Sequence, residues 1–431
     1  MSAHETSALG ASASLLSYGE AAAVVADFAR ALHPGAVETI DLADARGRVL
    51  AGAIAADVDQ PSFPRSTREG FACRAIEAST HEFLPVAGAT HAGEAPPPPL
   101  PPQAMWEIMT GAPMPAGADA VVMIEHVERD GERARLLPPR TAKPGENIVA
   151  QGEQARAGDA LIAAGTVMGP AQIALAAACG YASVSVHAQP RVAILTTGDE
   201  LVPVDREPGP GQIRNSNAPM LEALVRAAGG DPWISLTAGD TAESLDFALS
   251  VAADSDMLLI SGGVSAGKFD LVEPALARLG ATFHFTGVRI QPGKPLVFGA
   301  LRASTSGVDP AGEKVLPFFG LPGNPISSAA TFLLFAAPVI AALAGRRDLG
   351  PRFLAAELAQ GTDRRGNAGL TRFLPSWCEF DVPAGWLPQV ATVPWHGSGD
   401  LPAFARSNCF LVVPEGAATL EAGTQVRILM L

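Results

Sequence analysis

Four short loops in the second half of the chain carry the residues whose types and spacing could do chemistry. Their charged side chains are Asp199, Glu200, Lys268, Asp270 and Lys294. The glycines beside them let backbone N–H groups approach an anion, because no Cβ obstructs the path. Lysine offers a point charge for phosphate, and Mg²⁺ prefers carboxylates together with phosphates and water. The pattern therefore predicts a site for a small molecule that carries phosphate or a nucleotide. The loops span 196–200, 261–270, 291–295 and 320–325.

The same loops supply small and rigid residues that could contact the ligand. Helix starts expected near Asp270 and Pro325 would add the positive ends of helix dipoles. Pro322 and Pro325 are expected to set the shape of their loop. The predicted substrate-binding residues of these loops are Gly262, Gly263, Ser265, Lys268, Pro322, Gly323, Asn324 and Pro325.

Three acids are candidate ligands for Mg²⁺: Glu200, Asp240 and Asp270. Asp240 also has a purely structural interpretation, because Asp240 and Glu243 have the D-x-x-E spacing of a helix capping box. The histidines lack metal-ligand spacing, and no Ser-His-Asp or Cys-His arrangement suggests a protein nucleophile. The sequence also lacks a Walker A motif and a G-x-G-x-x-G motif, which weighs against ATPases and dinucleotide-binding enzymes.

Composition narrows the range of partners. The formal net charge of −14 argues against nucleic acid, since a phosphate backbone requires a basic face. The most apolar stretch, 329–344, is interrupted by Pro338 and is shorter than the roughly 20 residues that a membrane span needs. The N-terminal residues lack the basic segment of a signal peptide, and the four cysteines are scattered. We therefore expect a cytoplasmic protein that binds neither nucleic acid nor membrane, with a disordered leader at 1–14.

Alternating strand and helix patterns must position the loops. Apolar, β-branched runs predict strands between 190 and 346, and three- and four-residue apolar spacing predicts helices between them. This alternation implies a mostly parallel, doubly wound sheet, in which ligands bind outside the carboxyl ends of the strands. We expect the four loops to emerge on one side of that sheet. The predicted strands are 192–196, 233–236, 257–260, 296–298 and 315–319, and the predicted helices are 216–228, 240–253, 271–279 and 326–343.

The remaining sequence predicts a multidomain α/β protein. Short apolar runs separated by Pro and Gly clusters indicate a β-rich inserted domain at 57–146. The segments on either side of it, 15–56 and 147–189, are expected to form one small α/β linker domain, with a helix at 18–32. Residues 347–431 show short strands and turns, which indicate a C-terminal β-barrel domain. The doubly wound α/β domain occupies 190–346.

Several motifs in a fixed order resemble the molybdopterin molybdenumtransferase family, which includes the E domain of gephyrin. A second-domain signature resembles Met109–Pro113 and 115–122. The motif order matches across about 65–330, and the general layout matches nearly the whole chain. Several motifs in order are far more specific than any one Gly-rich loop. The other matching motifs are 196–201 (TTGDEL), 211–217 (GQIRNSN), 261–270 (SGGVSAGKFD), 292–295 (PGKP) and 320–327 (GLPGNPIS).

The resemblance implies a four-part homodimer whose α/β domain binds molybdopterin. It implies that molybdate and adenylylated molybdopterin are the substrates, that Mg²⁺ is required, and that molybdenum cofactor and AMP are the products. The active site would lie between the α/β domain of one subunit and the β-rich domain of the other. The molybdopterin adenylyltransferase and the molybdoenzymes that receive the cofactor would be further partners.

Functional positions of the family carry over one by one. Glu69 stands where the family has an acid in its S-A-M-D-G-Y motif, and Thr110 matches the threonine of M-T-G. Lys294 matches the lysine of PGKP. Glu200, Asp240 and Asp270 match acidic positions tied to the site, so Glu69, Thr110, Glu200 and Lys294 are the predicted catalytic residues.

The chain departs from the family pattern at several positions, one of which is Glu69, where the family's aspartate is lengthened. Acids are absent at Pro64 and Gln154, and a lysine is absent at Gln291. Two arginines appear instead, Arg65 and Arg68, which could bind molybdate or phosphate bidentately. The departures keep two alternatives open, a non-catalytic pterin-binding or scaffold protein and a molybdopterin adenylyltransferase.

Overall fold

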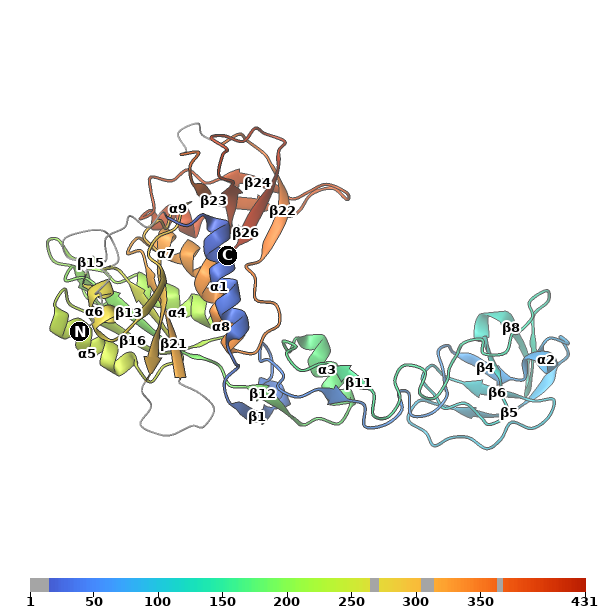
Figure 1. Ribbon diagram of the computed structural model, residues 1–431. Coiled ribbons are helices and arrows are strands. Elements are labelled where there is room, and N and C mark those ends of the chain that lie inside the picture. Colours follow the sequence, from blue (N-terminus) through green and yellow to red (C-terminus); the bar gives the residue numbers. More distant parts are fainter. Residues whose placement is uncertain (1–14, 264–270, 304–313, 363–366) are drawn as a thin grey trace, which may run out of the picture. The chain divides into compact units, whose positions relative to one another are not determined.

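A computed structural model describes residues 15–263, 271–303, 314–362 and 367–431 (Figure 1). The chain forms two compact units. The first comprises Met1–Glu38, Gly47–Ala51 and Ser185–Leu431, and the second comprises Thr39–Arg46 and Gly52–Val184. The second unit contains the whole of the predicted β-rich insertion, and the four-part division itself stays a prediction.

A six-stranded sheet forms the centre of the first unit, in the order β16-β13-β17-β21-β20-β18. Its first four strands are parallel, whereas β20 runs antiparallel to both β21 and β18. The sheet is therefore mixed, because its last two pairings are antiparallel. The strands are β13 (Arg191–Thr197), β16 (Asp231–Ala238), β17 (Met257–Ser261), β18 (Thr282–Phe285), β20 (Val297–Ala303) and β21 (Lys314–Leu321).

Helices cover both faces of this sheet, as the doubly wound prediction requires. Successive residues of β13 alternate between two cores: Val192 and Ile194 pack with α4, and Ala193 and Leu195 pack with α5 and α6. The helices are α1 (Tyr18–Ala31), α4 (Asn217–Ala228), α5 (Ala242–Ala252), α6 (Val272–Arg278) and a continuous run of α7 (Pro325–Thr331), the π-helix η3 (Phe332–Ala336) and α8 (Ala337–Leu343).

One local expectation was wrong. The α5 helix is capped by Thr241, whose side chain accepts from the Ser244 N–H, so Asp240 does not cap it. The predicted long helix at 326–343 is confirmed, and Pro338 lies within it because the π-helical turn before it rearranges the carbonyls that the proline ring would meet. The resulting 19-residue helix, Pro325–Leu343, has the length and hydropathy of a membrane span, but 83% of its apolar window is buried inside the fold.

A closed five-stranded barrel ends the chain, as predicted for the C-terminal domain. Its strands run β23-β24-β22-β26-β25, and β25 pairs with β23 to close the ring. The two-residue strand β19 (Ile290–Gln291) pairs with β23 in parallel and so joins the loop at 291–295 to the barrel. The barrel elements are β22 (Phe353–Leu358), β23 (Thr371–Glu379), β24 (Gln389–Thr392), α9 (Leu401–Ala405), β25 (Cys409–Val413) and β26 (Gln425–Met430).

The second unit is built on a six-stranded, largely antiparallel sheet in the order β7-β4-β6-β5-β9-β8. Short strand pairs continue the chain on both sides of it: β3 with β10, β2 with β11, and β1 with β12. The sheet strands are β4 (Gly70–Cys73), β5 (Leu84–Thr90), β6 (Met105–Ile108), β7 (Ala120–Met123), β8 (Val127–Asp130) and β9 (Arg133–Leu136). The remaining elements are β1 (Val37–Asp41), η1 (Leu42–Asp44), β2 (Ile54–Ala55), β3 (Arg65–Ser66), α2 (Ala75–Ala78), η2 (Ile124–His126), β10 (Ile148–Val149), β11 (Ala160–Ile162), α3 (Pro170–Ala178), β12 (Ser183–His187), β14 (Leu201–Val202) and β15 (Ile213–Arg214), the last two in the first unit.

All four cysteines are buried free thiols. Burial raises the pKa of Cys73 to about 12, and the nearby Asp119 carboxylate adds to the rise. The thiolate form, which is the nucleophile and metal ligand, is therefore strongly disfavoured at Cys73.

Gly70 is the residue of the second unit that tolerates a side chain least. A Cβ there would lie 1.9 Å from the Val122 carbonyl oxygen, an atom that no side-chain rotation can move. We predict that Gly70→Ala lowers the free energy of unfolding by at least about 3 kcal/mol. Gly52→Ala is the control, because a Cβ at Gly52 meets nothing within 4 Å, and its effect should stay within about 0.5 kcal/mol. Urea unfolding of the two variants measures both values, and equal effects would contradict this account.

Candidate functional site

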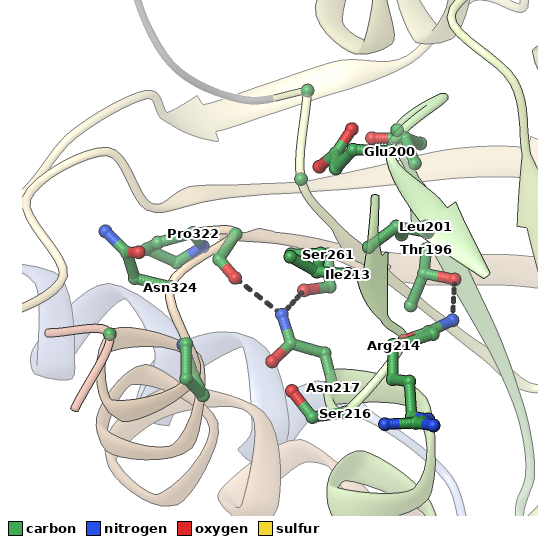
Figure 2. A pocket seen from close by; sticks show the side chains of 18 of the residues that line it. Thr196, Glu200, Leu201, Ile213, Arg214, Ser216, Asn217, Ser261, Pro322 and Asn324 are labelled. Carbon is green, nitrogen blue, oxygen red and sulfur yellow. Dashed lines mark hydrogen bonds between the residues drawn. The ribbon is translucent and has the colours of Figure 1, made fainter. Parts of the chain in front are cut away.

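A cavity of about 890 Å³ opens at the carboxyl ends of the parallel strands in the first unit (Figure 2). Strand β13 lies between β16 and β17 in the sheet, so connections leave its two sides in opposite directions. Such a switch point is where doubly wound sheets bind ligands. The barrel closes one side of the cavity with Gly399 and Leu401. The residues that follow the strand ends and line the cavity are Gly198, Glu200, Asp240, Gly262, Gly263, Pro322, Gly323, Asn324 and Pro325.

Several residues that line this cavity have backbone N–H groups without a protein partner among the described residues. Those of Ser216 and Asn217, at the start of α4, donate to no acceptor among the described residues. Those of Gly323 and Asn324, before α7, are likewise unpaired within the described part of the chain. Neither helix has an acid in its first turn. Two helix N-termini with free N–H groups and no competing carboxylate are suited to an anion.

Glycine at 262 lets the second loop pass closer to the first than another residue could. A Cβ on Gly262 would lie 2.8 Å from both the carbonyl oxygen and the hydroxyl of Thr197, and φ is +97° there. A Cβ on Gly323 would come 3.6 Å from Cα of Gly262, an ordinary van der Waals distance, so the second and fourth loops lie near each other without needing glycine at 323. The bare backbone at Gly262 agrees with the anion-binding interpretation.

The same cavity also carries acidic side chains, which favour a cation over an anion. Asp199 and Asp240 are interlocked: the Asp240 N–H donates to Asp199 Oδ1 at 3.0 Å, and the Asp199 N–H donates to Asp240 Oδ2 at 3.4 Å. Glu200 and Asp240 both line the cavity. Across the described residues, no three His, Cys, Asp or Glu side chains form a cluster that could hold a metal alone. A cation here would need ligands from the substrate as well.

The loop before α4 contributes side chains that the sequence analysis used only as a family motif. The Asn215 amide donates to Thr196 Oγ1 at 2.8 Å and to Thr237 Oγ1 at 3.2 Å, which joins β13 to β16. Asn217 donates to Ser261 Oγ and to the Gly323 carbonyl (Figure 2). These contacts could have been anticipated from the run of amide and hydroxyl residues before the predicted helix at 216–228, because side chains of that kind cap helices and cross-link loops.

The predicted basic residues take less central places. Lys294 is exposed and does not line the cavity, although its neighbour Pro295 does. Its backbone carbonyl accepts from the Val288 N–H and closes the third loop. Ser265, Lys268 and Asp270 lie outside the described residues. Arg214 is the cation on the described cavity lining.

A second group of predicted residues gathers in the second unit, around the buried Ser66. The Ser66 N–H donates to the Ala112 carbonyl, and the Gly111 N–H donates to the Ser66 carbonyl, which places the Thr110 turn beside the Arg65–Glu69 turn. Glu69 and Thr110 are exposed, as is Arg68, and Arg65 is half-buried. Within the described part of the chain, neither arginine makes a side-chain hydrogen bond or ion pair. Both guanidinium groups are available to an anion.

Comparisons with known proteins agree with this arrangement. Family models match three successive regions: "MoeA N-terminal region (domain I and II)" at 16–180, "Probable molybdopterin binding domain" at 193–342 and "MoeA C-terminal region (domain IV)" at 359–431. A Bacillus subtilis protein named molybdopterin molybdenumtransferase is 35% identical over 408 residues, which is 92% of this chain and 90% of that protein. The chain belongs to the molybdopterin molybdenumtransferase family.

Further relatives support the same membership. A Nostoc protein of the same name is 34% identical and covers 91% of this chain and 88% of its own length. The crystal structure of a molybdopterin biosynthesis MoeA protein from Pyrococcus horikoshii matches with a TM-score of 0.78 and 28% identity, over 97% of this chain and all of that one. Another structure of the P. horikoshii protein matches with a TM-score of 0.72 at 29% identity, over 96% of this chain and 99% of that one.

The predicted site residues fall into two groups, which lie in regions that match different family models. Glu200, Asp240, Pro322 and Pro325 line one cavity, inside the region that matches the molybdopterin-binding model. The carried-over Glu69 and Thr110 lie in the region that matches the N-terminal model. The roles of all these residues stay predictions.

Thr196 and Thr197 form a matched pair at the end of β13. The Thr197 hydroxyl is buried and has no partner among the described atoms, whereas the Thr196 hydroxyl is held by Asn215 and Thr237. We predict that Thr196→Val costs about 1–3 kcal/mol of unfolding free energy, because it removes one of the two acceptors of the buried Asn215 amide. Thr197→Val should be neutral or stabilising by up to about 1 kcal/mol in the ligand-free protein. Chemical denaturation of both variants tests this, and a large loss at Thr197 would show that its hydroxyl is bonded in solution.

Proposed function

We propose that the protein inserts molybdenum into adenylylated molybdopterin and releases AMP, forming molybdenum cofactor. The relatives named molybdopterin molybdenumtransferase support this reaction. The observation that carries it is one cavity in which unpaired N–H groups at two helix N-termini lie together with Glu200 and Asp240. Such a cavity suits a phosphoanhydride with a cation beside it.

The residues of this chain would act by positioning and electrostatics. The N–H groups of Gly323 and Asn324, with those at the start of α4, would hold phosphate oxygens of the adenylate. Fixed donors aimed at the oxygens that gain charge stabilise the transition state without reorganising. Holding the pterin dithiolene and molybdate in one cavity makes their reaction effectively unimolecular. No side chain needs to act as a nucleophile.

The acids fit Mg²⁺ as part of this site. Mg²⁺ is usually held by one or two carboxylates, substrate phosphates and water, so Glu200 and Asp240 would suffice with the adenylate bound. When bound, the ion would neutralise phosphate charge and polarise the phosphoryl group. The interlocked Asp199 and Asp240 keep the carboxylates near one another, an arrangement that a cation favours.

The site is proposed to be completed by a second subunit of a homodimer. The family resemblance implies that the β-rich region of the partner would lie at the molybdopterin-binding domain, and the guanidinium groups of Arg65 and Arg68 on that region have no partner among the described residues. Together with Lys294, they would hold molybdate, which the described cavity lining, with its single Arg214, is poorly equipped to do. Glu69 and Thr110 would flank them. We place the reaction in the cytoplasm, between a molybdopterin adenylyltransferase and recipient molybdoenzymes.

Reconstitution of a cofactor-free molybdoenzyme tests the reaction directly. Purified protein with molybdate, Mg²⁺ and adenylylated molybdopterin should restore the recipient's activity and release AMP, and EDTA should prevent both. Glu200→Gln should lower the AMP release rate at least about tenfold, about 1.4 kcal/mol of barrier. Glu207→Gln makes the same change on an exposed loop residue outside the cavity lining and should have no effect. Binding of the pterin without AMP release would favour the scaffold alternative, and formation of the adenylate from ATP and molybdopterin would favour the adenylyltransferase.

The two arginines should determine the affinity for molybdate. We predict that Arg65→Ala and Arg68→Ala each raise the KM for molybdate by about tenfold, because a charge-assisted bond to an oxyanion contributes about 1.5–3 kcal/mol. Arg46→Ala is the control, since Arg46 is an exposed arginine of the same unit whose side chain makes no hydrogen bond or ion pair with the described residues. A molybdate KM that is unchanged in both variants, measured by AMP release, would remove the arginines from the site.

A further inference from the structure

We propose that Asn217 is a positioning residue, which fixes the two phosphate-binding loops relative to each other; this inference rests on the proposed function. Its amide nitrogen donates to Ser261 Oγ at 2.9 Å and to the Gly323 carbonyl at 2.6 Å. Ser261 ends β17 and Gly323 follows β21, so one side chain joins α4 to both strand ends. Figure 2 shows both bonds diverging from the same nitrogen.

The side chain of Asn217 does nothing for its own helix. Asn217 is the first residue of α4, and the residue before it, Ser216, occupies the cap position. The Ala218 N–H is satisfied by Asn215, not by Asn217. The amide N–H groups of Asn217 therefore bond to the neighbouring loops. A helix-capping role does not explain these bonds.

Only an amide meets the chemical demand at this position. Both acceptors need a donor, and one NH₂ group carries two hydrogens at the right divergence. A carboxylate has no donor, and a hydroxyl has one. The assignment of nitrogen and oxygen is fixed by the Gly323 carbonyl, which can only accept. It follows that Oδ1 faces away from these acceptors, and this buried oxygen has no partner among the described residues.

The arrangement controls the groups that would hold the adenylate. Gly323 and Asn324 supply unpaired N–H groups, and Gly262 lies against Gly323 across the same cavity. An anion that bridges the α4 start and the 323–324 turn gains most when these donors are already spaced for it. Among the described residues, no side-chain hydrogen bond other than that of Asn217 joins Gly323 to β17 or α4.

The test compares Asn217→Ser with Asn408→Ser. Asn408 likewise uses its amide at both ends, to the Cys378 N–H and carbonyl, but it lies in the barrel away from the cavity lining. Calorimetric titration with AMP and Mg²⁺ on the full chain should show at least about tenfold weaker binding for Asn217→Ser and unchanged binding for Asn408→Ser. The KM for adenylylated molybdopterin should rise in parallel, because the displaced N–H groups hold phosphate oxygens of the substrate, and kcat should fall as well, because the same donors stabilise the charge that develops in the transition state.

A double-mutant cycle isolates the positioning effect. Ser261→Ala should weaken AMP binding in the wild-type background and add little in Asn217→Ser, because the shared bond is already lost. Hydrogen exchange of the Gly262 amide, which donates to the Leu321 carbonyl beside Gly323, should accelerate in Asn217→Ser, whereas amides of the barrel should keep their exchange rates and so show that the variant is folded.

The outcomes separate the two proposals. Wild-type protein that binds neither AMP nor the adenylate overturns the proposed function and this inference with it. Wild-type binding with unchanged affinity, unchanged KM and unchanged amide exchange in Asn217→Ser overturns the role of Asn217 alone. Additive effects of Ser261→Ala and Asn217→Ser would also overturn it.

Discussion

The unpaired backbone N–H groups at the carboxyl ends of the parallel strands are the constraint on which the rest of the site depends. Peptide N–H groups that find no acceptor in the protein stay open to water or to a ligand, and those of Gly323 and Asn324 belong to exposed residues, so an anion can replace water as their partner. Among the described residues, the four parallel strands bring these groups to one edge, where Gly262 and Gly323 lie close to each other. The side chains of Asn215 and Asn217 then hold the loops at a spacing that the strands alone would leave free.

The placement of charge follows from this backbone chemistry. Because the N–H groups can bind an anion without lysines, the described lining of the cavity carries Glu200 and Asp240 with only Arg214 against them. Carboxylates beside an anion-binding turn are unfavourable unless a cation lies between them. The cavity therefore combines donors for phosphate and acceptors for a metal within the same space. This division also explains why the predicted cation Lys294 can lie outside the lining.

The fold was largely predictable from the sequence, and the site only in part. The strand ends could be predicted because apolar, β-branched runs stop at Gly-rich loops. The loops that follow them meet at one edge because the strands are parallel. The antiparallel β20 was missed because a short apolar strand has the same pattern in either direction. Asp240 was ambiguous since spacing alone cannot distinguish a cap from a cavity residue, and Thr241 turned out to be the cap. Asn217 could not be predicted as a site residue from the sequence, because its hydrogen-bond partners are distant in sequence and one of them is a backbone carbonyl.

The departures from the family pattern change the charge at positions whose structural contacts are made by the backbone. Pro64 contributes its carbonyl to the Met114 N–H, and Gln154 donates its N–H to the Gln60 carbonyl, so any side chain could occupy either position. Gln291 is likewise held by its backbone, in the β19 pairing with β23. The loss of acids at 64 and 154 and the gain of Arg65 and Arg68 outweigh the lysine lost at 291, so these segments become more positive. An oxyanion substrate is attracted more strongly by such a surface, whereas a scaffold that had lost its reaction would have no reason to shift charge in one direction. The substitutions therefore argue for a retained, and electrostatically retuned, molybdate-using reaction.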